Sequence, residues 1–367
     1  MPVDPGYGER LARTVSQLYA DAELTLLRRI AAALTHGIDA PTWAVEKLAQ
    51  LDLLRARMGQ DVGALSEQAV GQIRTVIAGA WTTGQALAVA DLDDLDLDVR
   101  LPPARAAAIE RLAAETIRVV APVGARLLRA SLDVYTQVVA EASSQVLLGA
   151  GTRRDAAQTT LDRLTSHGIR SFTDTAGRRW TSESYVEMAV RTGAGRAAVQ
   201  GHVDQLQAVG LDLVMVSDHP RECDLCRPWE GKILSIGGAV AGTIETPSAT
   251  SGNTVRVRVA ATLDQARADG FQHPNCRHSI SAYVPGASRP ARDTADTQDR
   301  YEQGQQQRYL ERGVRAWKTR EAAALTPEAK AAAAAKVRVW QARLREHVAA
   351  HEGLSRQRAR EQVGRAR

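Results

Sequence analysis

Residues 210–236, GLDLVMVSDHPRECDLCRPWEGKILSI, contain the features on which the fold prediction rests. Residues 211–216 form a short branched run bounded by a glycine and a proline, which favours a β-strand. Residues 232–236 are a second strand candidate. Between them stand Cys223 and Cys226, two of only three cysteines in the 367-residue chain. The stretch therefore predicts two strands separated by a thiol pair suited to metal binding or redox chemistry.

Two further segments of the middle third have the composition of β-strands. Residues 254–259, TVRVRV, alternate in polarity, and residues 279–284 form another short run that fits a strand. The intervening residues 237–253 are rich in Gly, Ser and Thr, which is typical of a loop or a hairpin excursion. Residues 185–209 have the pattern of a helix. The sequence therefore predicts an α+β unit over roughly residues 165–286.

A second pair of metal-binding side chains follows after 46 intervening residues. His273-Pro-Asn-Cys276 presents an imidazole and a thiol at the same spacing as Cys223 and Cys226. Tetrahedral zinc is bound by such ligand pairs when two turns bring them together. Because four protein ligands leave no open coordination position, the predicted zinc site is structural and consists of Cys223, Cys226, His273 and Cys276.

The imidazole ligand of this predicted site has two alternatives. His219 precedes the first cysteine pair and His278 lies two residues beyond the third cysteine, so either could replace His273. A surface thiol pair with unrelated histidines is the plain alternative to a metal site. A thioredoxin-type redox pair is disfavoured, because Pro228 interrupts the helix that such a pair would open.

The first 150 residues carry apolar side chains at three- and four-residue spacing almost throughout, which predicts helices. The first helix is expected around residues 11–30, the second over residues 41–58 and the third over residues 64–89. Residues 105–148 are also periodic, with a kink expected near Pro122.

Positive charge is concentrated at the C-terminal end. Residues 299–367 contain 16 Lys and Arg against 8 Asp and Glu, whereas the net charge of the whole chain is only +5. This part is predicted to be helical from about residue 297, with fraying expected over residues 356–367. Two interpretations stay open: the basic helices contact a polyanion, or they present an ordinary solvated face.

The composition limits the class of protein. Hydrophobic residues make up 44% and charged residues 24% of the chain, which is typical of globular proteins and argues against wholesale disorder. Aromatic residues make up only 4%, which favours helices packed through small and branched side chains. The most apolar windows are interrupted by charges, so we expect no membrane helix. The N-terminal residues have no secretory pattern and are cytosolic in character.

The expected fold class is α+β, with a mainly helical N-terminal half and C-terminal tail flanking a small zinc-stabilised α+β domain. The predicted domains are residues 1–150, which are helical, residues 151–290, which form the zinc-binding α+β domain, and residues 291–367, which form a basic helical tail.

Five stretches of the chain resemble the phage minor capsid protein 2 family, which is related to the F-type head morphogenesis proteins of Mu-like phages. The stretches are GRRWTSESYVEMAVRT (177–192), DLVMVSDH (212–219), CDLCRPWEGKILSI (223–236), HPNCRHSISAYVPG (273–286) and YEQGQQQRYLERGVRAWK (301–318). The matches cover about residues 165–320, and the WEGK and HPNCRH blocks are the specific ones.

The resemblance implies a structural protein of the virion that is present in a few copies and acts in head assembly or DNA packaging. It implies a place at the portal vertex or on the inner capsid surface, and in the host cytoplasm during assembly. The partners would be the portal protein and the major capsid protein, contacted by the N-terminal helical domain, and packaged double-stranded DNA, faced by the basic tail. It implies no enzymatic turnover.

The family also bears on the metal ligands. Some relatives have His where this chain has Cys226 and lack counterparts of Cys223 and His273. This difference keeps His219 and His278 as alternative ligands.

Competing hypotheses belong to other classes of protein. A zinc-dependent nuclease or hydrolase carried in the head would need an open coordination position and a nearby carboxylate, and the usual zinc-enzyme motifs are missing from the sequence. An ADP-ribosyltransferase-like activity would need a toxin module, and we expect none after the helical tail. A zinc finger that reads DNA would separate its ligand pairs by about a dozen residues rather than 46.

Overall fold

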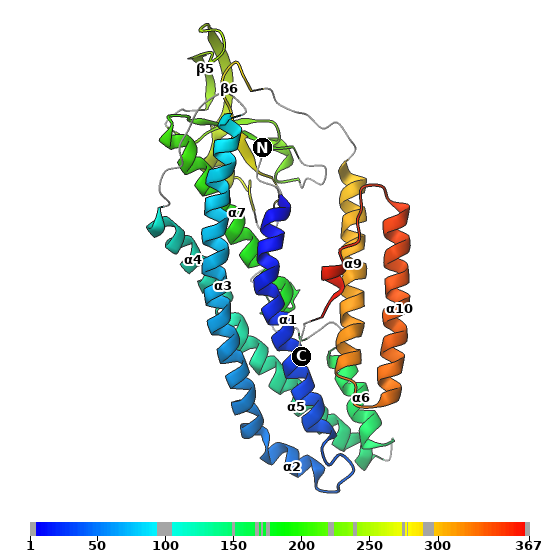
Figure 1. Cartoon of the computed structure of the whole chain (residues 1–367). Coiled ribbons are helices and arrows are strands. Elements are labelled where there is room, and N and C mark those ends of the chain that lie inside the picture. Colours follow the sequence, from blue (N-terminus) through cyan, green and yellow to red (C-terminus); the bar gives the residue numbers. More distant parts are fainter. Residues whose placement is uncertain are drawn as a thin grey trace. The chain divides into compact units, whose positions relative to one another are not determined.

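The computed structural model (Figure 1) describes residues 5–93, 105–148, 151–165, 169, 172–173, 177–218, 224–237, 241–273, 276, 278–288 and 297–363. The α-helices are α1 (Pro5–Thr35), α2 (Trp43–Ala49), α3 (Leu51–Asp93), α4 (Ala106–Val120), α5 (Pro122–Leu147), α6 (Arg153–Leu164), α7 (Ser182–Ala208), α8 (Leu263–Ala268), α9 (Thr297–Ala322) and α10 (Pro327–Ala350). The strands are β1 (Phe172–Thr173), β2 (Arg179–Trp180), β3 (Leu213–Val216), β4 (Ile233–Ser235), β5 (Gly242–Pro247), β6 (Thr254–Thr262) and β7 (Ile280–Ala282). Two short 3-10 helices are η1 (Arg227–Trp229) and η2 (Arg358–Glu361).

The chain forms two compact units, and each is assembled from segments that are distant in sequence. The first unit consists of Met1–Thr14, Gly71–Val119 and Glu187–Tyr301. The second unit consists of Val15–Val70, Val120–Val186 and Glu302–Arg367. The helices α1, α3, α7 and α9 contribute residues to both units, and α4 contributes its last residue, Val120, to the second. The division into three consecutive domains stays a prediction.

The first unit is built on a five-stranded mixed sheet with the strand order β5-β6-β4-β3-β7. The pair β4–β6 is parallel and the other pairs are antiparallel. Val214 of β3 pairs with Leu234 of β4 on one side and with Ala282 of β7 on the other. All four strands predicted from the sequence are present, and the predicted excursion over residues 237–253 contains β5, which forms a hairpin with β6 (Figure 1). The α+β class is confirmed.

Helices cover one face of this sheet. Ala88 and Leu92 of α3 and Val199, Val203 and Leu206 of α7 are buried in one apolar cluster with the sheet. Their partners on the strands are Val214, Val216, Leu234, Ala261, Ile280 and Ala282. The opposite face buries a smaller cluster of Leu213, Val257 and Val259. Because successive residues of a strand point to opposite faces, the branched run of β3 supplies both clusters.

Two glycines allow α3 and α7 to approach each other closely within the first unit. A Cβ atom on Gly84 would lie 1.9 Å from the backbone oxygen of Ala198, and one on Gly201 would lie 2.3 Å from that of Trp81. Any side chain at either position would force the helix backbones apart. The low aromatic content of the chain thus agrees with helices packed through small residues.

The second unit is helical apart from the two-stranded pair β1–β2. Its largest apolar cluster contains residues of α1, α2, α3, α5 and α6, including Leu26, Leu27, Ile30, Leu34, Trp43, Met58, Val62, Leu127, Tyr135, Val138 and Leu161. The polar atoms of two of these aromatic residues are satisfied by backbone carbonyls: Trp43 Nε1 donates to Leu34 at 2.9 Å, and the Tyr135 hydroxyl donates to Lys47 at 3.2 Å. The aromatic residues of the cluster are therefore buried without loss of their hydrogen bonds.

The C-terminal helices belong to this core. Ala323 and Leu325, between α9 and α10, are buried in the same cluster, and the Leu325 backbone N–H donates to Gln158 of α6 at 2.6 Å. Fraying over residues 356–367 was expected and is wrong for residues up to 363. Glu361 is 2% exposed and accepts hydrogen bonds from Arg356, an ion pair that the sequence spacing did not reveal.

One predicted helix boundary is also wrong. The sequence placed a break between residues 58 and 64, whereas α3 continues through this region and the break lies at Gln50. Met58 and Val62 stand one turn apart and are both buried in the second-unit cluster, so their packing favours a continuous helix. The break expected near Pro122 is confirmed, because α4 ends at Val120 and the proline occupies the first turn of α5.

None of the described helices combines the length and the apolarity needed to cross a bilayer.

Candidate metal centre

Three of the predicted ligand residues meet at one edge of the first-unit sheet. Cys226 immediately precedes η1, in the connection between β3 and β4, while Cys276 and His278 stand just before β7. Since β3 pairs with both β4 and β7, the segments that follow β3 and precede β7 are held together. Paired hydrogen bonds between Ser217 and Ser279 lock this junction: each backbone N–H donates to an oxygen of the other residue, at 3.0 and 2.9 Å.

The ligand atoms of these three residues form a compact group. The Cys226 and Cys276 sulfur atoms are 3.4 Å apart, and Cys276 Sγ lies 3.5 Å from His278 Nδ1. All three residues offer ligand atoms within 4.8 Å of one another. Cys226 is fully buried and His278 is 9% exposed. Cys276 is partly exposed, so the group is mostly buried, and its donor atoms lie close enough to share one ion.

These distances fit the geometry of a zinc site. Zn–S bonds of about 2.3 Å and Zn–N bonds of about 2.0 Å at tetrahedral angles place neighbouring ligand atoms about 3.5 to 3.8 Å apart. The two measured separations of 3.4 and 3.5 Å lie at or near this range. Two thiols and one imidazole are also the donor set that structural zinc prefers. The residues present therefore fit the ion.

The other nitrogen of the imidazole has a carboxylate partner. His278 Nε2 lies 2.5 Å from Glu230 Oε1, and the two side chains are 2% and 13% exposed. A carboxylate at this nitrogen fixes the ring orientation and leaves Nδ1 directed at the thiols. The contact is a buried ion pair whenever the imidazole is protonated, and otherwise a hydrogen bond.

The surroundings favour the charged forms of the cysteine and the histidine. The hydrogen bond from Cys226 lowers the pKa of Cys276, and contacts with His278 lower it further against the opposing effect of burial. Burial lowers the pKa of His278, but the hydrogen bonds to Cys276 and Glu230 outweigh it and raise the pKa above its ordinary value. The thiolate is the form of cysteine that binds metals, but histidine binds them only as the neutral imidazole, so an ion at this site would have to replace the proton on His278 Nδ1.

A small hollow of about 60 Å³ adjoins the group. It is lined by Arg191, Thr192, Gly195, Arg196, Val199, Gln272, His273, Cys276 and His278. The hollow is large enough for a water molecule or a small side chain, but not for a substrate of ordinary size.

Comparison with known sequences identifies the protein family of the chain that carries this centre. The sequence profile of the family described as phage minor capsid protein 2 matches residues 3–349. The chain belongs to this family. The match extends far beyond the five stretches that first suggested it and includes both structural units.

Two relatives of this minor capsid family member are phage proteins, each named "Structural protein". The one from Lactococcus phage LL-H is 26% identical over 238 residues, which are 63% of this chain and 62% of the relative. The one from Lactococcus phage mv4 is 36% identical over 97 residues, which are 24% of this chain and 77% of the relative. The chain thus spans less than two thirds of the length of the LL-H protein. No solved structure matches the chain.

The structure brings some of the ligands predicted from the sequence together and leaves others out of the group. Cys226 and Cys276 are brought together, as the spacing indicated, and the alternative histidine His278 joins them. Among the described residues, His273 is not part of the three-ligand group; it lies at the hollow and its backbone oxygen accepts from the Cys276 N–H at 2.9 Å. Cys223 and His219 lie outside the described residues.

Sequence reasoning missed the role of Glu230 as the partner of His278. These residues are 48 positions apart, and only the pairing of β3 with its two neighbours brings them together. Trp229, beside Glu230, packs against the apolar cluster of the first unit.

Proposed function

We propose that this chain is a minor structural component of the head of a tailed bacteriophage, placed at the portal vertex or on the inner capsid surface, where it assists head assembly and DNA packaging. The family match over residues 3–349 carries the proposal. The names of both relatives agree with a structural role in a phage particle.

The helical part of the chain offers a surface for portal or capsid neighbours. Val45 and Leu48 of α2 and Leu53 of α3 are 72%, 54% and 54% exposed. Single exposed apolar side chains are common, but three within nine residues form a local apolar surface of the kind that subunit contacts cover. We assign this corner to contacts with the portal protein or the major capsid protein.

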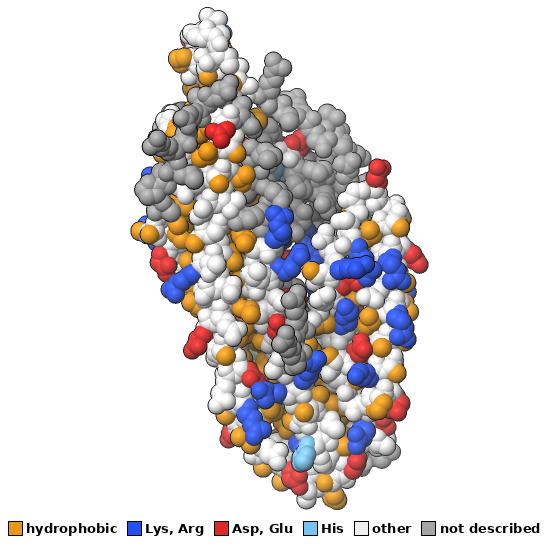
Figure 2. Space-filling view, viewed as in Figure 1, with side chains coloured by type: hydrophobic (Ala, Val, Ile, Leu, Met, Phe, Trp, Pro, Cys, Tyr) orange, Lys and Arg blue, Asp and Glu red, His pale blue; other side chains and the backbone are white. Residues whose placement is uncertain are grey.

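The C-terminal helices offer a surface for packaged DNA. Figure 2 shows Lys and Arg side chains distributed over α9 and α10, interspersed with fewer acidic ones. The exposed basic residues of α10 are Lys330, Lys336, Arg338, Arg343 and Arg345, whereas its acidic residues are Glu328 and Glu346. Such a surface supports weak contacts with phosphates that do not depend on base sequence.

The metal centre serves stability rather than reaction in this proposal. One zinc ion is held by Cys226, Cys276 and His278 Nδ1, and Cys223 is the predicted fourth ligand. The geometry of the described residues favours His278 over His273 as the imidazole ligand. When bound, the ion supplies a crosslink between the β3–β4 connection and the segment before β7, which stiffens the sheet edge.

The alternative is a zinc-dependent enzyme carried in the head. The hollow beside Cys276 and His278 is the observation in its favour, because a catalytic zinc keeps one position open to water. Glu230, the nearby carboxylate, is engaged by His278 and so is a poor candidate for a general base. Metal-dependent nuclease, esterase or ADP-ribosyltransferase turnover that is lost in Cys276→Ser would favour this alternative.

The deciding experiment is quantitative mass spectrometry of purified virions, combined with particles from a phage that carries a stop codon in this gene. The proposal expects a few copies per particle relative to the major capsid protein, chemical crosslinks to the portal or the capsid, and mutant heads that are malformed or lack DNA. Absence from the virion, or full and normal DNA content without the protein, would overturn it.

A further inference from the structure

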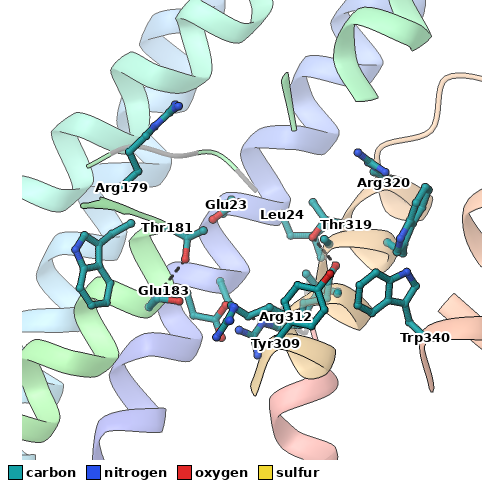
Figure 3. A pocket seen from close by; sticks show the side chains of 18 residues that line it. Glu23, Leu24, Arg179, Thr181, Glu183, Tyr309, Arg312, Thr319, Arg320 and Trp340 are labelled. Carbon is teal, nitrogen blue, oxygen red and sulfur yellow. Dashed lines mark hydrogen bonds and ion pairs between the residues drawn. The ribbon is translucent and has the colours of Figure 1, made fainter. Parts of the chain in front are cut away.

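A second cavity lies within the helical second unit, far along the chain from the metal ligands. Its volume is about 530 Å³, within the range of sites that bind small molecules or single side chains. Figure 3 shows the side chains that line it. They come from α1, from β2 and the start of α7, from α9, from α10 and from Val363 near the C-terminal end.

The cavity gathers a large share of the aromatic residues of the chain. Trp180, Trp317 and Trp340 line it, three of the six tryptophans in the sequence, and Tyr309 joins them. Aromatic residues make up only 4% of the chain, so this concentration is not an effect of composition. Tryptophan, tyrosine and arginine are the residues that dominate binding hot spots.

The position of Trp340 depends on a glycine of the neighbouring helix. A Cβ atom on Gly313 would lie 2.1 Å from Cε3 of Trp340, so the indole ring packs where any other residue would place a side chain. The ring of Tyr309 meets Trp340 edge-on at 5.5 Å between centroids. The aromatic wall formed by α9 and α10 is therefore close-packed.

The wall also carries more positive than negative charge. Arg315 Nε lies 3.5 Å from a carboxylate oxygen of Glu183, so the charges of these two side chains compensate each other. Arg320 lies over the Trp317 ring at 4.3 Å and donates through Nη2 to the Asp162 carbonyl, but its buried Nε has no hydrogen-bond partner among the described residues.

Arg312 has no hydrogen bond or ion pair with another described residue, and Figure 3 shows it beside Tyr309. Arg179 also borders the cavity, but its guanidinium points away from the other labelled side chains in Figure 3. Two guanidinium groups, those of Arg312 and Arg320, thus have donors available inside the cavity.

The remaining acid adds little negative charge. Glu23 is buried and accepts a hydrogen bond from the Ile169 N–H at 2.8 Å. The pKa of Glu23 is raised to about 7, chiefly by burial and to a smaller extent by Glu183, while the Ile169 hydrogen bond and Arg315 oppose the shift. Near neutral pH a large fraction of this carboxyl is therefore protonated, and the cavity keeps its positive character.

We propose that this cavity binds a peptide segment of a partner protein, with a large apolar side chain of that segment among the tryptophans and a carboxylate on Arg312 and Arg320. The carboxylate would satisfy the unpartnered Arg320 Nε and the available Arg312 guanidinium, both by charge-assisted hydrogen bonds. The apolar side chain would complete the aromatic wall. The site is separate from the metal centre and does not depend on the proposed place in the head.

A nucleic acid base fits the same cavity less well. Binding by stacking needs an open aromatic face, whereas Arg320 covers the face of Trp317 and Tyr309 stands edge-on against Trp340. A peptide carboxylate and a nucleic acid phosphate are both negatively charged and could both bind the arginines, so the test includes a nucleotide.

The test measures binding of small probes to the full chain by tryptophan fluorescence and by ligand-observed NMR. N-Acetyl-L-phenylalanine supplies an apolar ring with a carboxylate, N-acetyl-L-phenylalaninamide supplies the same ring without the charge, and thymidine monophosphate represents nucleic acid. We expect the acid to bind roughly tenfold more tightly than the amide, because only the acid forms charge-assisted hydrogen bonds.

The variants locate the binding. Arg312→Gln is expected to remove most of the difference between acid and amide, and Ala316→Leu, which fills the cavity from α9, is expected to abolish binding of both probes. Arg338→Gln changes an exposed arginine of α10 outside the cavity and is expected to leave binding unchanged. Thermal melts identify any variant that fails to fold, and Arg312→Gln, at an exposed position, is the one expected to be folded.

Three results would overturn the proposal. One is equal affinity for acid and amide in the unaltered chain. Another is no binding of the acid at any soluble concentration. The third is that thymidine monophosphate binds more tightly than N-acetyl-L-phenylalanine and that Arg312→Gln weakens its binding. This result would assign the cavity to nucleic acid instead.

Discussion

The carboxylate of Glu230 lies 2.5 Å from Nε2 of His278, so that only Nδ1 of the imidazole faces the thiols of the proposed zinc site. Glu230 follows η1 and His278 precedes β7, so the contact also joins the two segments that carry the ligands. The contact makes Glu230 a positioning residue that touches no metal itself.

The first prediction concerns this positioning. Glu230→Ala is expected to weaken zinc binding about 10- to 100-fold, the usual effect of removing the partner of a metal-bound histidine. Glu230→Gln keeps an acceptor for Nε2–H and is expected to lose less. Affinity is measured by competition with a zinc chelator, and Glu245→Gln, an exposed acid of β5, is the control. Unchanged affinity in Glu230→Ala would show that the carboxylate does not support the ligand.

A second prediction distinguishes the two histidines near the thiols. His278→Ala and Cys276→Ser are expected to lose stoichiometric zinc and to lower the melting temperature, whereas His273→Ala keeps both. Elemental analysis and thermal melts of protein prepared without chelator provide the measurement. The opposite pattern, zinc lost with His273 and kept without His278, would restore the ligand set predicted from spacing alone. No zinc in the unaltered protein would remove the metal proposal and leave the family assignment untouched.

Packing between α3 and α7 leads to the third prediction. Gly84→Ala places a methyl group 1.9 Å from the Ala198 backbone oxygen, which cannot move without separating the helices, and is expected to cost about 3 kcal/mol of unfolding free energy. Gly71→Ala lies on the same helix with nothing within 4 Å of the added atom. This control is expected to stabilise the protein by about 0.5 to 1 kcal/mol, because alanine is the better helix former. Chemical denaturation measures both, and equal effects would contradict the close approach.

Local patterns were sufficient to predict much of the first unit. The alternating residues 254–259 and the branched run 211–216 identify strands because a half-buried sheet imposes a period of two. The cysteine spacing likewise identified Cys226 and Cys276 as neighbours. It did not decide between His273 and His278, because that choice depends on β7 pairing with β3 and on the Glu230 contact.

Contacts between distant segments account for what the sequence did not predict. The continuity of α3 depends on Met58 and Val62 packing into a cluster with α1 and α5. The order of residues 356–363 depends on the Arg356–Glu361 ion pair and on the hydrogen bond from Gln341 to Glu361 at 3.1 Å. The aromatic cavity is assembled from five separate segments, and its tryptophans have no common spacing in the sequence.

A fourth prediction concerns His202 of α7, which is fully buried 3.5 Å from Asp91 of α3. Burial lowers the pKa of His202 from 6.5 to about 4, although the Asp91 carboxylate opposes this effect. Above pH 6.5 the ring is neutral in both the folded and the unfolded state and adds no pH dependence. Between 6.5 and about 4 the unfolded ring takes up a proton that the folded ring refuses, so stability falls as the pH falls.

The loss of unfolding free energy across this window is about 3 kcal/mol at most, because it follows from the fall of the His202 pKa from 6.5 to about 4. His202→Gln is expected to flatten the pH dependence of the unfolding free energy in this window, even if it lowers stability at neutral pH. His36→Gln, at an exposed position after α1, is the control and is expected to keep the original slope. An unchanged slope in His202→Gln would mean that the ring is protonated in the folded protein.

The last prediction tests contact between the C-terminal helices and DNA. Deleting residues 299–367 would be uninformative, because Leu325 and Ala323 lie in the second-unit core and their loss would damage the fold. Charge removal on the helix surface avoids this problem. The triple variant of α10 is Lys336→Gln, Arg338→Gln and Arg345→Gln, and the matched control on α3 is Arg55→Gln, Arg57→Gln and Arg74→Gln.

Both triple variants lower the net charge by the same amount, so a difference between them reports where DNA lies rather than the overall charge. Each phosphate contact adds roughly 0.9 to the slope of log affinity against log salt, so losing three contacts lowers that slope by about 3. The α10 variant is expected to show this loss in gel shifts at several salt concentrations, without a change in sequence preference, while the α3 variant binds like the unaltered chain. Equal losses in both would indicate diffuse attraction, and undiminished binding in the α10 variant would remove this helix from the DNA-facing surface.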